Sequence, residues 1–354
     1  MADAGSWYVS YRLSQKKMDA QLERSSMRYQ EFVRVVEREL NKKLRGGVHA
    51  AVYKAVKNNG KEKQGILIES PGIHISPTIY LDEFYGDYEA GKDLGEIVEE
   101  VLSFYDEVRC ESPWDFGALE DYGNICKKMC FKLINTEKNR AMLKVMPHID
   151  ILDLSIVFYV VLEMTESGSA TMPVYNSHLA RWGVSIHQIW KDARKNAMGL
   201  LPAQFFTMSS VLENGGEEEQ EEKDCFEENY MRRNGKGAET DLFADPLSGR
   251  DTMYVLSNPV RSLGAACILY PKVLNMIGGI LGEDYYILPS SIHEVVIVPK
   301  SRGLEPGEMN EMVSRINETQ VMEEEVLSNH AYFYACREKK LTGCSLQSAG
   351  IMLG

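Results

Sequence analysis

Apolar residues recur three and four positions apart in several segments, the spacing of helices that bury one face. The clearest case covers residues 94–105, which follow a capping-box pair of Asp93 and Glu96. A second capping-box pair, Ser185 and Gln188, precedes another such segment. The same spacing predicts helices over residues 27–44, 79–89, 137–145, 186–199, 271–281 and 306–317.

Runs of β-branched and aromatic residues predict strands between these helices. The turn Asn58-Asn59-Gly60 joins two of them and is typical of a hairpin, because Asn and Gly tolerate positive φ. Since strands adjoin in hairpins as often as they alternate with helices, we expect an α+β fold with mixed, largely antiparallel sheets packed with amphipathic helices. The strands are expected at residues 48–56, 64–70, 128–136, 151–162, 171–175, 204–212, 253–256, 285–288, 295–298 and 331–336.

The chain has 354 residues, which suggests two lobes because domains usually span about 100–200 residues. A Glu- and Gly-rich stretch within the second lobe has few apolar anchors and is interpreted as a mobile surface excursion. The expected order is an N-terminal arm (1–25), an N-terminal α/β lobe (26–125), a C-terminal α+β lobe (126–338) with the excursion at 214–250, and a loose tail (339–354).

Charge is unevenly distributed along the chain. The net charge is −13, and residues 82–121 hold fourteen acidic and two basic side chains. Proteins that grip phosphate backbones concentrate Lys and Arg instead, so we expect no nucleic-acid partner. An acidic surface favours a basic protein partner, which it attracts through long-range steering.

The sequence also indicates a compartment. The first residues show no signal peptide, and the longest apolar run, Leu154–Leu162, is far shorter than the roughly 20 residues of a membrane span. Seven scattered cysteines without a C-x-x-C pair indicate reduced thiols and no zinc site. We therefore expect a cytoplasmic protein with no membrane contact.

Familiar catalytic signatures are missing: there is no G-x-G-x-x-G, P-loop, H-E-x-x-H, G-x-S-x-G or EF-hand pattern. No cofactor is expected. His148, Asp150 and Asp153 could bind a divalent metal, but carboxylates before a strand are common without one, so no metal is expected either.

The most polar turn between apolar strands is Ser290-Ser291-Ile292-His293-Glu294. Ser290, Ser291, His293 and Glu294 are candidates to line a ligand site, because the ends of central strands are where clefts form. The alternative is a capped hairpin turn, since His293 and Glu294 point to opposite faces of a strand. Asn176 and His178, between a strand and a helix, are further candidates.

Three tyrosines, Tyr80, Tyr85 and Tyr88, could form a partner surface, because tyrosine offers a large rigid area with a polar tip. At helical spacing, such tyrosines belong more often to the core.

Five sequence strings are specific as a set: Ser76–Leu81 with Phe84-Tyr85, Phe131–Asn135, Asn176–Trp182, Leu288–Glu294 and Asn317–Val321. Together they resemble an uncharacterised bacterial family, domain of unknown function 5688, known mainly from anaerobic gut-associated Gram-positive bacteria. The likeness covers roughly residues 26–338, and it implies no reaction and no catalytic residues. A second, looser likeness at Val174–Asn196 is to another uncharacterised family of cytosolic bacterial proteins.

Two functions stay open on the sequence alone. The first is a non-enzymatic cytoplasmic binding or regulatory protein that acts through protein–protein contacts, with an undetermined oligomeric state. The second is a metal-independent hydrolase or transferase with a site near His293. A deep pocket that holds His293 with a second ionisable group would favour the enzyme, and a solvated turn would favour the binding protein.

Overall fold

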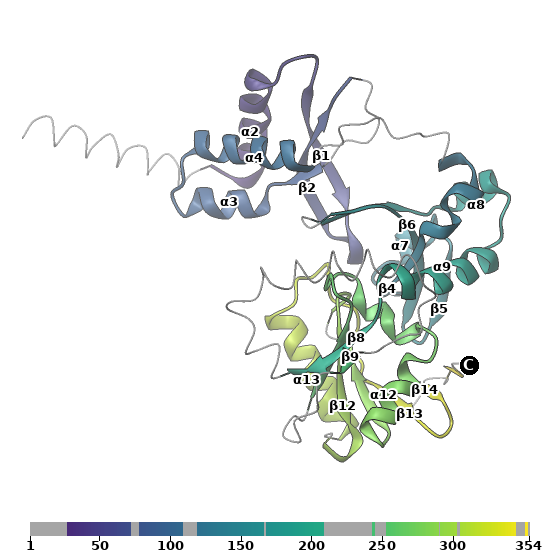
Figure 1. Ribbon diagram of the computed structural model, residues 1–354. Coiled ribbons are helices and arrows are strands. Elements are labelled where there is room, and N and C mark those ends of the chain that lie inside the picture. The colour runs from purple at the N-terminus through teal and green to yellow at the C-terminus, as the bar shows by residue number, and fades with distance from the viewer. Residues whose placement is uncertain are drawn as a thin grey trace, which may run out of the picture. The chain divides into compact units, whose positions relative to one another are not determined.

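The chain forms two compact units in a computed structural model (Figure 1). The N-terminal unit comprises Met1–Lys57 and Glu62–Asp115, and the C-terminal unit comprises Asn58–Lys61 and Phe116–Gly354. The structure describes residues 27–71, 78–108, 119–165, 168–208, 243–244, 253–289, 291–302, 305–344 and 351–352. The expected arm (1–25) and most of the acidic excursion lie outside these ranges.

The boundary between the units lies before the one expected at residue 125. Helix α6 (Tyr122–Ile125) lies in the C-terminal unit, where the Tyr122 hydroxyl donates a hydrogen bond of 2.7 Å to Asp192 of α9 (Ile186–Leu200).

The N-terminal unit is a three-stranded antiparallel sheet packed with helices. The strands lie in the order β1 (His49–Val56), β2 (Glu62–Glu69), β3 (Thr78–Tyr80). The β1–β2 hairpin is confirmed, with Asn59 and Gly60 of its turn at φ of 59° and 70°. The helices are α2 (Tyr29–Lys43), α3 (Asp82–Glu89) and α4 (Leu94–Val108).

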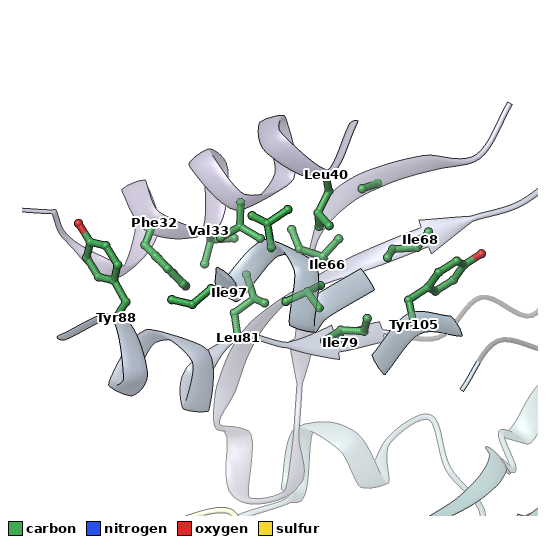
Figure 2. Close-up of a cluster of buried hydrophobic side chains, with 14 residues drawn as sticks. Phe32, Val33, Leu40, Ile66, Ile68, Ile79, Leu81, Tyr88, Ile97 and Tyr105 are labelled. Carbon is green, nitrogen blue, oxygen red and sulfur yellow. The ribbon is translucent and has the colours of Figure 1, made fainter. Parts of the chain in front are cut away.

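The core of this unit follows from the apolar stripes of its helices. Phe32, Val33 and Leu40 of α2 point toward Ile66 and the other inner residues of the sheet (Figure 2). The whole cluster is buried, and burying each large side chain contributes roughly 1.5–3 kcal/mol. Helix packing on one sheet face therefore holds the unit together.

The free edge of β1 is covered by side chains of α2. The amide of Asn41 donates to the Ala50 carbonyl at 2.7 Å and accepts from the Ala50 N–H at 2.9 Å, as a neighbouring strand would. Glu37 accepts from the Val52 N–H at 3.0 Å. Exposed edge strands invite pairing with other chains, so these two side chains block part of that edge.

The C-terminal unit contains two sheets. The smaller one has the order β4–β6–β5, with β7 also pairing with β6, and all its pairs are antiparallel. Helix α9 packs against β4. The N-cap of α9 is confirmed, because the Ser185 side chain accepts from the Gln188 N–H. The strands are β4 (Met129–Asn135), β5 (His148–Ile151), β6 (Leu154–Thr165) and β7 (Gly168–Pro173).

The larger sheet has the order β15–β14–β13–β11–β12–β10–β8–β9. The pairs are antiparallel except for β8 and β9, which are parallel. Its strands are β8 (Gln204–Thr207), β9 (Phe243–Ala244), β10 (Tyr254–Ser257), β11 (Tyr285–Leu288), β12 (Val295–Pro299), β13 (Tyr332–Ala335), β14 (Lys340–Gly343) and β15 (Ile351–Met352).

Helices cover both faces of this sheet at its centre. Leu288 and Val296 pack with Met309 and Val313 of α13 (Pro306–Thr319). On the other face, the Tyr285 hydroxyl donates to the Leu274 carbonyl of α12 (Val273–Leu281). Burial on both sides explains why β12 is apolar throughout. The largely antiparallel sheets packed with helices confirm the expected α+β class.

Three expectations need correction. Residues 79–89 are not one helix: Ile79 pairs with Ile66 in the sheet, and α3 begins only at Asp82. The strand expected at 151–162 is a hairpin of β5 and β6, turned at Leu152 with φ of 56°. The tail expected from residue 339 contributes β14, because a turn ending at Lys339 returns the chain to pair with β13.

Candidate functional site

The turn between β11 and β12 lies at the end of the two central strands of the large sheet. Leu288 pairs with Val296, and Val295 pairs with Leu256 near the end of β10. The loop that follows β10, residues 258–264, therefore lies beside the turn. Ser290 is outside the described residues.

The ring of His293 has a partner at each nitrogen. Its Nδ1 accepts a hydrogen bond of 3.2 Å from the Leu263 N–H, and its Nε2 lies 3.3 Å from Oε1 of Glu325. Because Nδ1 accepts, the neutral ring carries its proton on Nε2, facing the carboxylate. The arrangement holds the ring between two chain segments.

The serines beside the ring bond to backbone groups. The Ser291 hydroxyl accepts from the His293 N–H at 3.0 Å, and the Ser257 hydroxyl donates to the His293 carbonyl at 2.8 Å. Glu294 is half-buried, and the carboxylate at the ring is Glu325 instead. Ser291, His293 and Glu294 therefore do not assemble as a nucleophile, a base and an orienting acid.

The loop 258–264 has an unusual backbone. Arg261 and Leu263 have φ of 48° and 57°, a conformation that costs L-residues roughly 1–2 kcal/mol each. Asn258 closes the loop, donating to the Ser262 carbonyl and accepting from its N–H. A Cβ at Gly264 would lie 2.5 Å from the His293 carbonyl oxygen, so only glycine fits this close approach.

A second polar cluster surrounds Asp153, which was considered as a metal ligand. Its carboxylate accepts hydrogen bonds from Ser328 at 2.5 Å and Tyr332 at 2.6 Å, so the side chain joins two segments of the unit. Burial and the nearby Asp153 charge raise the pKa of Tyr332 well above its ordinary value. Within the described part of the chain, no three His, Cys, Asp or Glu side chains gather closely enough to hold a metal ion.

The segment 323–328 accepts hydrogen bonds from several distant residues, which the sequence did not indicate. The Asn58 side chain donates to the Glu324 carbonyl, and the Asn59 side chain donates to the carbonyls of Glu323 and Val326. The Asn135 side chain donates to the Leu327 carbonyl. The Glu325 carbonyl accepts from the Ile292 N–H at 2.8 Å. No local signal distinguishes Glu325 from the two acidic residues before it.

Asn176 and His178 lie on the short helix α8 (Asn176–Trp182), in a separate cluster. His178 stacks on Trp182 at 5.1 Å and meets Tyr175 edge-on at 5.6 Å. Burial, with the charge of Arg181, lowers the pKa of His178, which favours the neutral ring. The Asn176 amide donates to the Lys144 carbonyl at 3.3 Å.

The three tyrosines do not form one surface. Tyr88 is 3% exposed and packs on Phe32, and the Tyr85 hydroxyl donates to the Met27 carbonyl at 3.0 Å. Tyr80 lies on β3 with the Lys57 ammonium 3.9 Å from its ring centre. The expectation of a partner surface is wrong for Tyr88, because its spacing places it on the core face of α3.

Comparison with protein families identifies the family of this chain. A model of a family of unknown function, DUF5688, matches residues 29–336. The chain belongs to this family. The match includes both polar clusters and the His293 turn, and the family brings no assigned reaction to this DUF5688 protein. No curated protein and no solved structure matches the chain. None of the described helices is long and apolar enough to cross a membrane.

Proposed function

We propose that this DUF5688 protein is a non-enzymatic binding or regulatory protein of the bacterial cytoplasm, whose acidic helical surface docks a basic protein partner. The observation that carries the proposal is the exposure of the carboxylates on α3, on α4 and between them. These side chains are Asp82, Glu83, Asp87, Glu89, Asp93, Glu96, Glu99, Glu100 and Asp106. We call them the acidic surface.

Basic residues are scarce in the sequence of the segment that carries this charge. Lys92 is the single basic residue between positions 82 and 108. Its Nζ lies 3.1 Å from Oδ2 of Asp87 and 2.7 Å from Oε1 of Glu100. Lys43 of α2 pairs with Glu99. All nine carboxylates of the acidic surface are exposed, so their like charges make the local potential negative, which attracts a basic partner.

An exposed aromatic residue supports docking at the same place. Phe104 of α4 is 40% exposed and lies one helical turn from Glu100. Aromatic side chains supply much of the binding energy at interfaces, whereas rim charges mainly set association rate and specificity. The combination suits a partner with basic groups around an apolar pocket.

The enzymatic alternative at His293 has weaker support. A general base must reach the proton that it abstracts, but both nitrogens of this ring already have partners. The cavity beside the neighbouring loop, lined by Val260, Ser262 and Leu263 among others, has a volume of about 20 Å³. That is room for about one water molecule.

The test compares two charge-reversal variants of the full chain as bait in a native lysate. One variant carries Glu83→Lys and Glu96→Lys on the acidic surface. The matched control carries Glu311→Lys and Glu318→Lys, two exposed carboxylates of α13. Both change the net charge by the same amount, so non-specific electrostatic capture changes equally.

We expect a protein captured by the wild type and the control to be lost by the acidic-surface variant. Its capture should also weaken with added salt, because exposed charges are screened. Equal capture of every partner by both variants would contradict the proposal, and so would partners without basic surfaces.

A further inference from the structure

The ring of His293 connects three segments of the C-terminal unit. The residue belongs to the turn before β12. Its Nδ1 accepts a hydrogen bond from the Leu263 N–H, and its Nε2 lies beside the Glu325 carboxylate in the segment after α13. The contact at Nδ1 requires a lone pair, so it exists only while the ring is neutral. The contact at Nε2 is compatible with both charge states.

Protonation changes only one of these contacts. A proton on Nδ1 would face the Leu263 N–H across 3.2 Å, and two donors cannot share a hydrogen bond. At the other nitrogen, the charged ring forms an ion pair with Glu325. The turn therefore stays attached to the segment after α13 while its bond to the loop is lost.

We propose that protonation of His293 releases residues 259–263 from the turn, which makes this loop a pH-sensitive element of the fold. Histidine is the side chain that ordinarily changes charge between about pH 5 and 8, and the test below spans that range. This inference concerns a different unit from the acidic surface, and it does not depend on that surface binding a partner.

The loop is poised for release by its own backbone. Leu263 keeps a positive φ of 57° with its N–H bound to the ring, and Arg261 has a φ of 48°. Losing the bond at Nδ1 removes a contact that holds Leu263 in this disfavoured conformation. Gly264 and the residues after it stay in place, because the bonds from Ala265 to Ile292 and from Ser257 to His293 do not involve the ring.

The charged groups around the ring come from its own turn, from the loop and from the segment after α13. Glu325 faces Nε2, and Glu294 follows His293 in its own turn. In the loop, the charged residue is Arg261, whose guanidinium lies over the Phe206 ring at 5.6 Å. In the segment after α13, Glu323 pairs with Lys61.

Release of the loop has a structural consequence. Val260, Ser262 and Leu263 form one side of the 20 Å³ cavity, and Thr171 and Leu201 form part of the other. Movement of the loop opens this cavity and exposes its apolar walls. At acidic pH the protein therefore presents a surface that is closed at neutral pH.

The experiment measures amide hydrogen exchange by NMR in the full chain at pH 7.5 and 5.5, with intrinsic rates corrected for pH. We expect the protection of the Leu263 amide to fall at least tenfold at pH 5.5. The Ile292 amide, which bonds to the Glu325 carbonyl, should keep its protection and serves as the internal reference. The proton on Cε1 of His293 reports the charge of the ring in the same samples.

The matched variant is His293→Asn, whose amide oxygen can replace Nδ1 as an acceptor but does not titrate. It should show the same Leu263 protection at both pH values. Three results would overturn the inference: unchanged Leu263 protection while the ring titrates, a ring that keeps one charge state across this range, or pH-dependent protection that persists in the variant.

Discussion

Replacing Asn41 with alanine is expected to lower the free energy of unfolding by about 2 kcal/mol. The side chain makes three hydrogen bonds, two with Ala50 of the edge strand and one of 3.0 Å with the Glu37 carbonyl. Each contributes roughly 1 kcal/mol net. Alanine has the higher helix propensity, which offsets about 0.6 kcal/mol of this loss.

Urea unfolding of the full chain measures this loss, and hydrogen exchange assigns it to the strand. The Ala50 amide should exchange much faster in the variant, whereas the Val52 amide keeps its Glu37 partner. The control is Lys42→Ala on the same helix, since Lys42 is 62% exposed and an exposed ion pair such as its pair with Glu39 contributes little to stability.

The edge of β1 also becomes available to other chains when Asn41 is removed. Light scattering should therefore detect concentration-dependent association of the variant that the wild type lacks. If Asn41→Ala stays within about 0.5 kcal/mol of the wild type and Ala50 stays protected, the amide does not stand in for a strand.

Three further predictions concern other parts of the molecule. Gly264→Ala should cost about 1–3 kcal/mol in thermal unfolding because its Cβ meets the His293 carbonyl, whereas Gly279→Ala, which has open space, should be neutral or stabilising. Burial raises the pKa of both Cys130 and Cys267 to about 12, so mass spectrometry should find them unalkylated by iodoacetamide at pH 8 until the protein is denatured. Duplex DNA should not bind with a sub-micromolar Kd at about 150 mM salt, because the net charge of −13 opposes the phosphates; such a Kd in a titration would refute the charge argument.

The elements that depend on local sequence were predicted well. Helices α4 and α9 begin and end close to the expected residues, because their apolar stripes and capping residues are encoded within one segment. The β1–β2 hairpin follows from the Asn-Asn-Gly turn for the same reason. The apolar character of β11 and β12 correctly indicated the centre of a sheet.

Pairing between distant segments was not predictable in this way. Ile79 continues a helical pattern in the sequence, yet it forms a strand at the edge of β2. Pairing with Ile66 satisfies the backbone polar groups of Ile79 and buries its side chain. The last strands were missed because their pairing depends on the position of β13.

The candidate site shows the same division. The sequence by itself determined that a histidine and hydroxyl groups occupy a turn between two buried strands, since a polar cluster between apolar runs must lie at a strand end. Only the tertiary structure decided that His293 meets the backbone of Leu263 and the carboxylate of Glu325, at positions thirty residues before it and thirty-two after it. Which residues surround a turn depends on the order and register of the strands, and long-range packing selects both.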